Sequence, residues 1–301
     1  MDGIINVYKE AGYTSFDVVA KLRGILKQKK IGHTGTLDPD AEGALPICLG
    51  KATKVCEYLL EKDKVYRAVL RLGVTTDTQD MSGTVVRECS PNLSEERLLE
   101  LIQTFTGKQM QIPPMYSALK VNGRKLCDLA RAGVTVERKA REIEIYSIEA
   151  LSVDMPCVTI QVHCSKGTYI RALCHDIGES AGCGGCMERL LRIKTGSFSI
   201  QDAYKLDEIE AAAKGTHPQG KRLSDLMFPI DSVLGEYPCV TAVKGTEKIL
   251  FNGGRLLAKQ TMGQDRFSPA LYRMYNAEGQ FVGLFRYDEK KLEFYPQKMF
   301  L

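Results

Sequence analysis

The chain has 301 residues, a length that exceeds one typical hydrophobic core and predicts two domains. Hydrophobic residues make up 44% of it, which excludes an intrinsically disordered or collagen-like chain. It has no run of 18 apolar residues and no N-terminal basic segment followed by an apolar one, so neither a transmembrane helix nor a secretory signal is predicted. We therefore expect a cytoplasmic protein with ten reduced cysteines. A net charge of +4 is too small to indicate a nucleic-acid partner by itself.

Apolar periodicity predicts strands and helices in alternation along the first 200 residues. In chain order, we expect a strand over 4–8, a helix capped by Thr14 or Ser15, a strand over 44–49, a helix over 53–60, strands over 64–73 and 84–87, a helix capped by Ser94, strands over 142–153 and 157–164, and a helix from 169 to 181. In the 64–73 strand, Tyr66, Ala68, Leu70 and Leu72 share one face, and the other face carries Val65, Arg67, Val69 and Arg71.

A glycine-rich loop over residues 32–43 precedes the short buried strand at 44–49. Its sequence is Gly-His-Thr-Gly-Thr-Leu-Asp-Pro-Asp-Ala-Glu-Gly, and three glycines and a proline exclude a helix or a central strand there. Asp38 stands before Pro39, which favours extended backbone at the aspartate. From these residues alone, the Asp38 carboxylate either closes an Asx-type turn or serves chemistry.

A basic segment spans residues 108–141. It contains eight basic and two acidic residues, so its surplus of six positive charges exceeds the net charge of the whole chain. The basic residues are Lys108, Lys120, Arg124, Lys125, Arg131, Arg138, Lys139 and Arg141. A solvated surface explains many such runs. Here prolines, glycines and Tyr116 interrupt the run, which indicates a projecting loop-and-helix arm that faces RNA.

The string Lys-Gly-Thr-Tyr-Ile-Arg over 166–171 leads into the helix expected up to residue 181. The apolar face of that helix is core, whereas Tyr169 and Arg171 at its start can point elsewhere. Arg171 either forms a surface ion pair of little energetic value or holds a catalytic carboxylate ionised and oriented.

Cys183-Gly184-Gly185-Cys186 forms one C-x-x-C, which is compatible with a redox pair or half of a zinc site. The sequence offers no second C-x-x-C, and a structural zinc requires four ligands. We therefore interpret the two glycines as a tight turn after the helix.

The last 66 residues contain several short predicted strands separated by turns. We expect strands over 239–243, 270–275, 280–286 and 292–295, after an exposed connection at 214–222. Short strands at this spacing predict a small β-barrel.

Three strings together resemble the bacterial tRNA pseudouridine-55 synthases. These are the loop over 32–43, the string Ile-Pro-Pro-Met-Tyr-Ser-Ala-Leu-Lys over 112–120, and the string over 166–171. The resemblance implies an α+β fold with a mixed, mainly antiparallel sheet, flanking helices and a small C-terminal PUA-like β-barrel. It implies a catalytic domain over 1–235, with its RNA-binding arm at about 108–141, and a PUA-like RNA-binding module over 236–301.

The resemblance also implies roles for individual residues. Asp38 would be the nucleophile in the isomerisation of uridine 55 in the T loop of tRNA. The base and substrate pocket would contain His33, Tyr66, Tyr169, Arg171 and Leu190. Phosphate contacts would come from Lys120, Arg124 and Lys125. The expected partner is the T arm of tRNA, the expected state is a monomer, and no metal or cofactor is expected.

Two other functions fit part of this pattern. A non-catalytic RNA-binding or RNA-folding protein explains the basic arm but leaves Asp38 and Arg171 unused. A synthase for a different uridine shares the chemistry, because the arm and the C-terminal module select the target. The sequence also leaves open whether Asp38 attacks C1′, attacks C6 or promotes a glycal intermediate.

Overall fold

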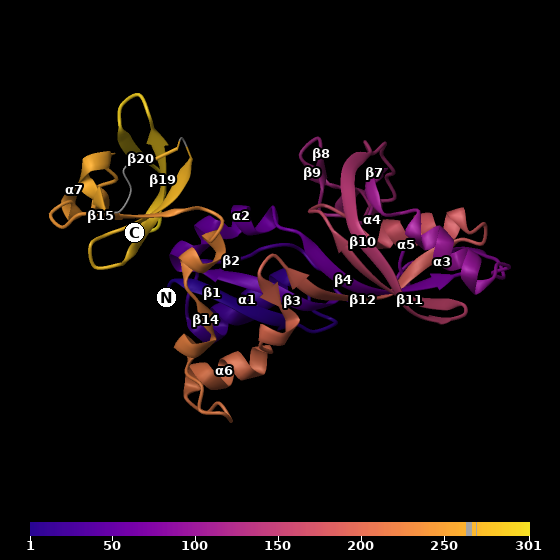
Figure 1. Cartoon of the computed structure of the whole chain (residues 1–301). Coiled ribbons are helices and arrows are strands. Elements are labelled where there is room, and N and C mark those ends of the chain that lie inside the picture. Colours follow the sequence, from indigo (N-terminus) through magenta and orange to yellow (C-terminus); the bar gives the residue numbers. More distant parts are fainter. Residues whose placement is uncertain (263–266, 269) are drawn as a thin grey trace.

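The structure is a computed structural model that describes residues 1–262, 267–268 and 270–301. Its centre is a ten-stranded sheet (Figure 1). Across the sheet lie β14 (Met227–Phe228), β1 (Gly3–Lys9), β3 (Glu42–Leu49), β12 (Gly185–Thr195), β4 (Lys64–Leu72), β11 (Cys157–Cys164), β10 (Arg141–Asp154) and β7 (Gly107–Gln111). Two short strands, β2 (Ile31–His33) and β13 (Phe198–Ser199), pair with β3 and β12. These strands pair antiparallel except for β3 with β12, so the predicted mixed, mainly antiparallel sheet is confirmed.

Helices cover the two halves of the sheet. The helices of the first 235 residues are α1 (Ser15–Leu26), α2 (Cys56–Leu60), α3 (Glu95–Gln103), α4 (Leu126–Arg131), α5 (Ile170–Ser180) and α6 (Leu206–Lys214), whereas α7 (Glu247–Phe251) packs in the C-terminal part. One apolar cluster joins α1 and α6 to β1 and β3, and a second joins α3 and α5 to β4, β10, β11 and β12. Among the described residues, no helix has both the length and the hydropathy needed to cross a membrane.

Local sequence signals explain several of these elements. Thr14 caps α1, and its hydroxyl accepts from the backbone N–H of Asp17 while the Asp17 carboxylate accepts from the N–H of Thr14. This reciprocal capping box satisfies two donors that the first helical turn leaves free. In β4 the alternating residues Tyr66, Ala68, Leu70 and Leu72 are all buried, so the face that they share is the inner one.

The segment expected as one helix over 53–60 is divided. A 3₁₀ helix, η1 (Gly50–Val55), is followed by the single short α-helix α2. Gly50 has φ of +57°, a left-handed conformation that glycine adopts without strain. The chain therefore turns tightly out of β3 before α-helical geometry begins.

The central strand β12 was not predicted. Its residues follow the turn after α5 and occupy the middle of the sheet between β3 and β4. Pairing with β4 shifts register between Met187 and Arg189 and again between Arg192 and Lys194. These two irregularities break the alternation of apolar and polar residues by which a half-buried strand is recognised.

The C-terminal part forms a separate six-stranded sheet that closes into a nearly complete small barrel, as predicted. In spatial order its strands are β16 (Leu256–Leu257), β20 (Glu293–Met299), β19 (Phe281–Asp288), β18 (Leu271–Tyr275), β15 (Cys239–Ala242) and β17 (Thr261–Met262). Leu284 and Phe300 of this part pack in one apolar cluster with Val55 and Leu59. In Figure 1 this barrel lies at one end of the molecule, beside α2 and β2.

The basic arm lies toward the other end of the molecule in Figure 1. It carries a two-stranded hairpin, β8 (Lys120–Val121) with β9 (Arg124–Lys125), followed directly by α4. This agrees with the predicted loop-and-helix element. A second hairpin, β5 (Val74–Thr76) with β6 (Val85–Glu88), extends from the end of β4.

Candidate active site

The Asp38 loop connects β2 to β3 and is fixed by hydrogen bonds to its neighbours. Leu37 is buried, and its N–H donates to the Ser15 hydroxyl at 2.9 Å. Farther along the loop, the N–H of Gly12 donates to the Pro39 carbonyl at 3.0 Å. Ser15 at the start of α1 and Gly12 in the preceding turn therefore hold the loop on both sides of Asp38.

Lys9, at the end of β1, lies beneath the loop and is fully buried. Its ammonium donates to the carbonyls of Pro39 at 2.9 Å, Ala41 at 2.5 Å and Glu10 at 3.1 Å. Burial lowers the pKa of Lys9 to about 8, although the charge of Asp38 opposes this shift. Three carbonyl acceptors use all three ammonium donors, so Lys9 fixes the backbone immediately after Asp38.

A second buried cation, Arg192 of β12, fixes the outer parts of the loop. Its Nε donates to the Ala44 carbonyl at 2.7 Å and its Nη2 to the Gly35 carbonyl at 3.3 Å. Gly43 lies against the Arg192 backbone with φ of +115°, and a Cβ there would collide with that backbone. The glycine is thus required by both its conformation and this close approach.

Arg171 and Asp38 form a two-point ion pair. Arg171 Nε lies 3.0 Å from Asp38 Oδ2, and Arg171 Nη2 donates to Asp38 Oδ1 at 3.2 Å. The Arg171 side chain is 5% exposed, whereas that of Asp38 is 35% exposed. A buried arginine fork therefore orients a carboxylate whose remaining surface faces outward.

Asp80, which the sequence analysis did not identify, is the second carboxylate on Arg171. Its Oδ2 lies 3.2 Å from Arg171 Nη1. Its Oδ1 accepts from the Thr78 hydroxyl at 2.7 Å and the Ser82 N–H at 3.0 Å. The carbonyls of Thr78 and Tyr116 also accept from Arg171, at 3.1 and 2.7 Å. All three guanidinium nitrogens of Arg171 therefore have a hydrogen-bond or ion-pair partner.

The charge balance around Asp38 favours its protonated form relative to a free aspartate. Burial raises the pKa of the Asp38 carboxyl, and the negative charges of Asp80 and Asp40 act in the same direction. Arg171 and Lys9 oppose the rise. Of these two cations, Arg171 lowers the pKa of Asp38 more, so it contributes most to keeping Asp38 ionised.

Tyr66 and Leu190 come from the adjacent strands β4 and β12 and pack in one cluster with Leu37 and Ala41 of the loop. Both side chains are less than 10% exposed. Burial raises the pKa of Tyr66, and the charge of Asp38 adds to the rise. An aromatic ring and an apolar side chain therefore pack directly against the Asp38 loop.

Tyr169 ends the extended segment before α5 and is half-buried. Buried Gln111 of β7 holds its backbone, because the Gln111 side chain accepts from the Tyr169 N–H at 2.9 Å and donates to its carbonyl at 3.0 Å. Burial raises the pKa of Tyr169. The charge of Arg171 opposes this rise, and that of Asp38 adds to it. The structure thus brings Asp38, Arg171, Tyr66, Tyr169 and Leu190 together.

His33 lies at the end of β2, five residues before Asp38, and is partly buried. Burial and the charge of Arg192 lower the pKa of His33 below its usual 6.5. The imidazole is therefore neutral at pH 7.

Lys120, Arg124 and Lys125 lie on the exposed β8–β9 hairpin rather than in the pocket. Within the described ranges, none of the three has a carboxylate within ion-pair distance. The arm reaches the site through Tyr116, whose carbonyl accepts from Arg171.

The turn that the sequence places at Gly184 and Gly185 lies slightly earlier, over residues 181–184, and Gly185 and Cys186 already belong to β12. Gly182 and Gly184 have φ of +78° and +79°, and β12 begins at Gly185. Both cysteines are buried as free thiols. In the part of the chain that the structure describes, no group of three or more His, Cys, Asp or Glu side chains is arranged to hold a metal.

Two family models and many curated proteins match this chain. The model of the TruB family pseudouridylate synthase N-terminal domain matches residues 23–170, and that of the tRNA pseudouridylate synthase B C-terminal domain matches residues 171–235. The chain is 49% identical to tRNA pseudouridine synthase B of Lachnoclostridium phytofermentans, with all of both chains covered. It is 45% identical to the protein of that name from Clostridium kluyveri, over 94% of this chain and 95% of the relative.

A solved Cbf5–Nop10–Gar1 complex contains a similar chain, with a TM-score of 0.75 and 26% identity over 99% of this chain and 85% of that one. A chain of an H/ACA ribonucleoprotein bound to a substrate RNA has a TM-score of 0.73 at 24% identity, with the same coverage, and shows the fold alone. The full-length relatives and both domain matches show that this chain belongs to the TruB family of pseudouridylate synthases.

Proposed function

We propose that this protein isomerises uridine to pseudouridine at position 55, in the T loop of tRNA, with the Asp38 carboxylate as the nucleophile. The observation that carries the proposal is the two-point pairing of Asp38 with buried Arg171. The relatives' name, tRNA pseudouridine synthase B, supports tRNA as the substrate.

The reaction exchanges one bond for another. The N1–C1′ bond of the uridine breaks, the base turns, and a C5–C1′ bond forms. The C5 proton leaves and N1 gains a proton, so the product is an isomer and no co-reactant is consumed. An ionised Asp38 suits attack at C1′, attack at C6 or an elimination that gives a glycal.

The target base must leave the helical stack, which costs a few kcal/mol. An aromatic platform returns about 1–3 kcal/mol per stacked base, which is comparable to this cost. We assign this role to Tyr66, with Tyr169 and Leu190 lining the same pocket. His33, neutral and next to the catalytic loop, would keep the neighbouring RNA open. Arg171 would hold Asp38 ionised once the base excludes water.

We further propose that residues 1–235 form the catalytic unit and that residues 236–301 form a PUA-like RNA-binding module. Lys120, Arg124 and Lys125 would contact phosphates of the T arm, because exposed cations on a projecting hairpin suit backbone contacts. The protein would act on the T arm as a monomer.

The test is tritium release from tRNA labelled at C5 of uridine, followed by mapping of the modified nucleotide. The proposal requires release of the label from position 55 and no release from a tRNA with cytidine at that position. Release from another uridine would assign the enzyme a different target. RNA binding without any release by the wild-type protein would identify a non-catalytic RNA-binding protein.

A further inference from the structure

We propose that a basic groove between α1, β2 and η1 is a second RNA contact, distinct from the arm and adjoining the uridine pocket at His33. It would hold a backbone phosphate of the tRNA on Arg23, Lys29 and Lys30, with a base or ribose against Phe16. This inference rests on the proposed function, because its occupant is the same substrate RNA.

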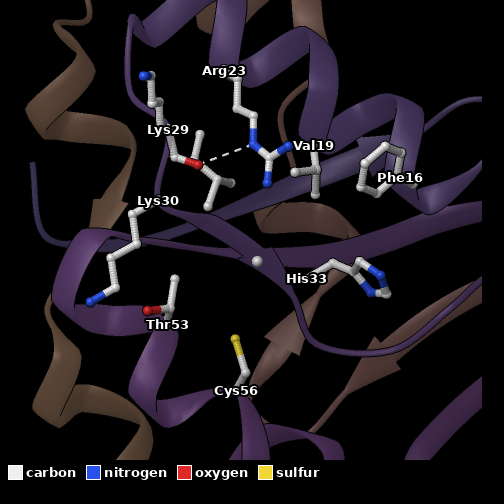
Figure 2. Close-up of a pocket in the computed structure, with 10 residues that line it drawn as sticks. Phe16, Val19, Arg23, Lys29, Lys30, His33, Thr53 and Cys56 are labelled. Carbon is white, nitrogen blue, oxygen red and sulfur yellow. Dashed lines mark hydrogen bonds between the residues drawn. The ribbon is translucent and has the colours of Figure 1, made fainter.

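The groove has a volume of about 550 Å³ and lies beside the catalytic loop (Figure 2). Its lining residues are Phe16, Val19, Arg23, Lys29, Lys30, Ile31, Gly32, His33, Thr53 and Cys56. In Figure 2 the two lysine side chains lie toward one end, and Phe16 and His33 lie toward the other. His33, which begins the segment that leads to Asp38, is the lining residue that connects the groove to the Asp38 loop.

The charge of the groove fits a polyanion. Its lining contains three permanent cations and no carboxylate. Within the described residues, Arg23, Lys29 and Lys30 also lack an ion-pair partner elsewhere. Arg23 uses its Nε to donate to the Lys29 carbonyl at 3.1 Å, which leaves its two terminal nitrogens for a phosphate.

Phe16 is the second element of the site. It lies in the first turn of α1 with 63% of its surface exposed, although the buried face of that helix is formed by Val18, Val19, Leu22 and Leu26. The Arg23 guanidinium lies 5.7 Å from the centre of its ring. An exposed ring beside unpaired cations is the arrangement by which single-stranded nucleic acids are held through stacking and charge.

The walls of the groove are already fixed by the fold. The Lys30 carbonyl accepts from the Gly50 N–H at 2.8 Å, and the Lys29 carbonyl accepts from the Ile31 N–H at 3.1 Å. β2 pairs with β3 through residues 31–33. These bonds fix the backbone while both lysine side chains remain exposed, so binding requires ordering of the side chains only.

The test compares Lys29→Gln and Lys30→Gln with Lys27→Gln as the matched control. Lys27 is exposed at the same end of α1 but does not line the groove. For each variant, the Kd for full-length tRNA is measured at several salt concentrations, together with the single-turnover rate at saturating enzyme. We expect each groove variant to reduce the slope of log Kd against log salt by about 0.7–0.9. Lys27→Gln should leave the slope unchanged.

Phe16→Ala should weaken tRNA binding by about tenfold with little change in salt slope, because stacking is not electrostatic. Its thermal unfolding should match that of the wild type, since the ring is exposed. The groove proposal is overturned if both lysine variants keep the wild-type slope, if Lys27→Gln reduces it equally, or if Phe16→Ala binds normally.

The saturated single-turnover rate separates this proposal from the proposed function. Groove variants should bind less tightly but react at the wild-type rate once saturated. If the wild-type protein released no tritium, the proposed function would fail, while the salt slopes would still decide whether the groove binds RNA.

Discussion

The Arg171 guanidinium holds both oxygens of the Asp38 carboxylate from a position that is itself almost completely buried. Only the arginine is buried, and the Asp38 side chain is 35% exposed, so breaking the pair should cost more than the roughly 1 kcal/mol of an exposed ion pair and less than the about 3–5 kcal/mol of a fully buried one. Arg171 therefore orients Asp38 and opposes the rise that burial causes in its pKa.

Replacing Arg171 with Met should lower the single-turnover rate at neutral pH by about a hundredfold or more. The pKa of Asp38 is already raised by burial, and loss of the opposing cation raises it further. The rate should therefore recover partly as pH increases and Asp38 ionises. A pH–rate profile of tritium release with excess enzyme measures this.

The conservative variant Arg171→Lys provides the control. It keeps the charge but loses the two-point fork, so its rate should fall between the wild type and the Met variant. A Met variant with the wild-type rate and pH profile would show that Arg171 does not govern Asp38.

Asp80→Asn should shift the acidic limb of the pH–rate profile in the direction opposite to that expected for Arg171→Met. The Asp80 charge raises the pKa of Asp38, so its removal lowers that pKa and moves the acidic limb of the profile to lower pH. The maximum rate should fall about tenfold because Arg171 loses one of its charged anchors. The same tritium assay measures both effects, and an acidic limb shifted upward would contradict this arrangement of charges.

Lys9→Met should lower the free energy of unfolding by about 1–3 kcal/mol, because three loop carbonyls lose their donor while a buried charge is removed. In the wild type, the pKa of Lys9 is about 8 when folded, against its ordinary 10.5. The unfolded chain then binds more protons between these values, so Lys9 makes stability rise with pH from about 8 to 10.5. Urea unfolding at several pH values should show a smaller rise in the variant. An equal rise would show that Lys9 titrates normally.

Much of this architecture could be predicted because its signals are local. Three features follow from residues close together in the sequence: the alternation in β4, the Thr14 cap and the glycine-rich Asp38 loop. The buried cations Lys9 and Arg192 could not be predicted, since both donate to backbone carbonyls, which every residue carries. The sequence therefore does not show which backbone carbonyls will accept from Lys9 or Arg192.

Asp80 was missed for a related reason. It lies in a polar turn whose Thr and Asp residues suit ordinary turn hydrogen bonds, and Thr78 and Ser82 do bind one of its oxygens. Only the folded chain shows that its other oxygen reaches Arg171, 91 residues away in the sequence.

Neutralising Lys120, Arg124 and Lys125 to Ala should flatten the salt dependence of tRNA binding by about one unit of slope per lost phosphate contact. The reason is that all three are exposed cations on the β8–β9 hairpin. Binding isotherms at several salt concentrations measure the slope. The wild-type slope in the triple variant would identify the hairpin as ordinary solvated surface.

The most direct test of the central claim is the Asp38→Asn variant with excess enzyme over labelled tRNA in a single turnover. Asn preserves the size of the side chain but provides no carboxylate, and tRNA binding relies on other residues. We predict a tRNA Kd within about threefold of the wild type and a rate of tritium release below about one-thousandth of it. Appreciable isomerisation by this variant would contradict the assignment of Asp38 as the nucleophile.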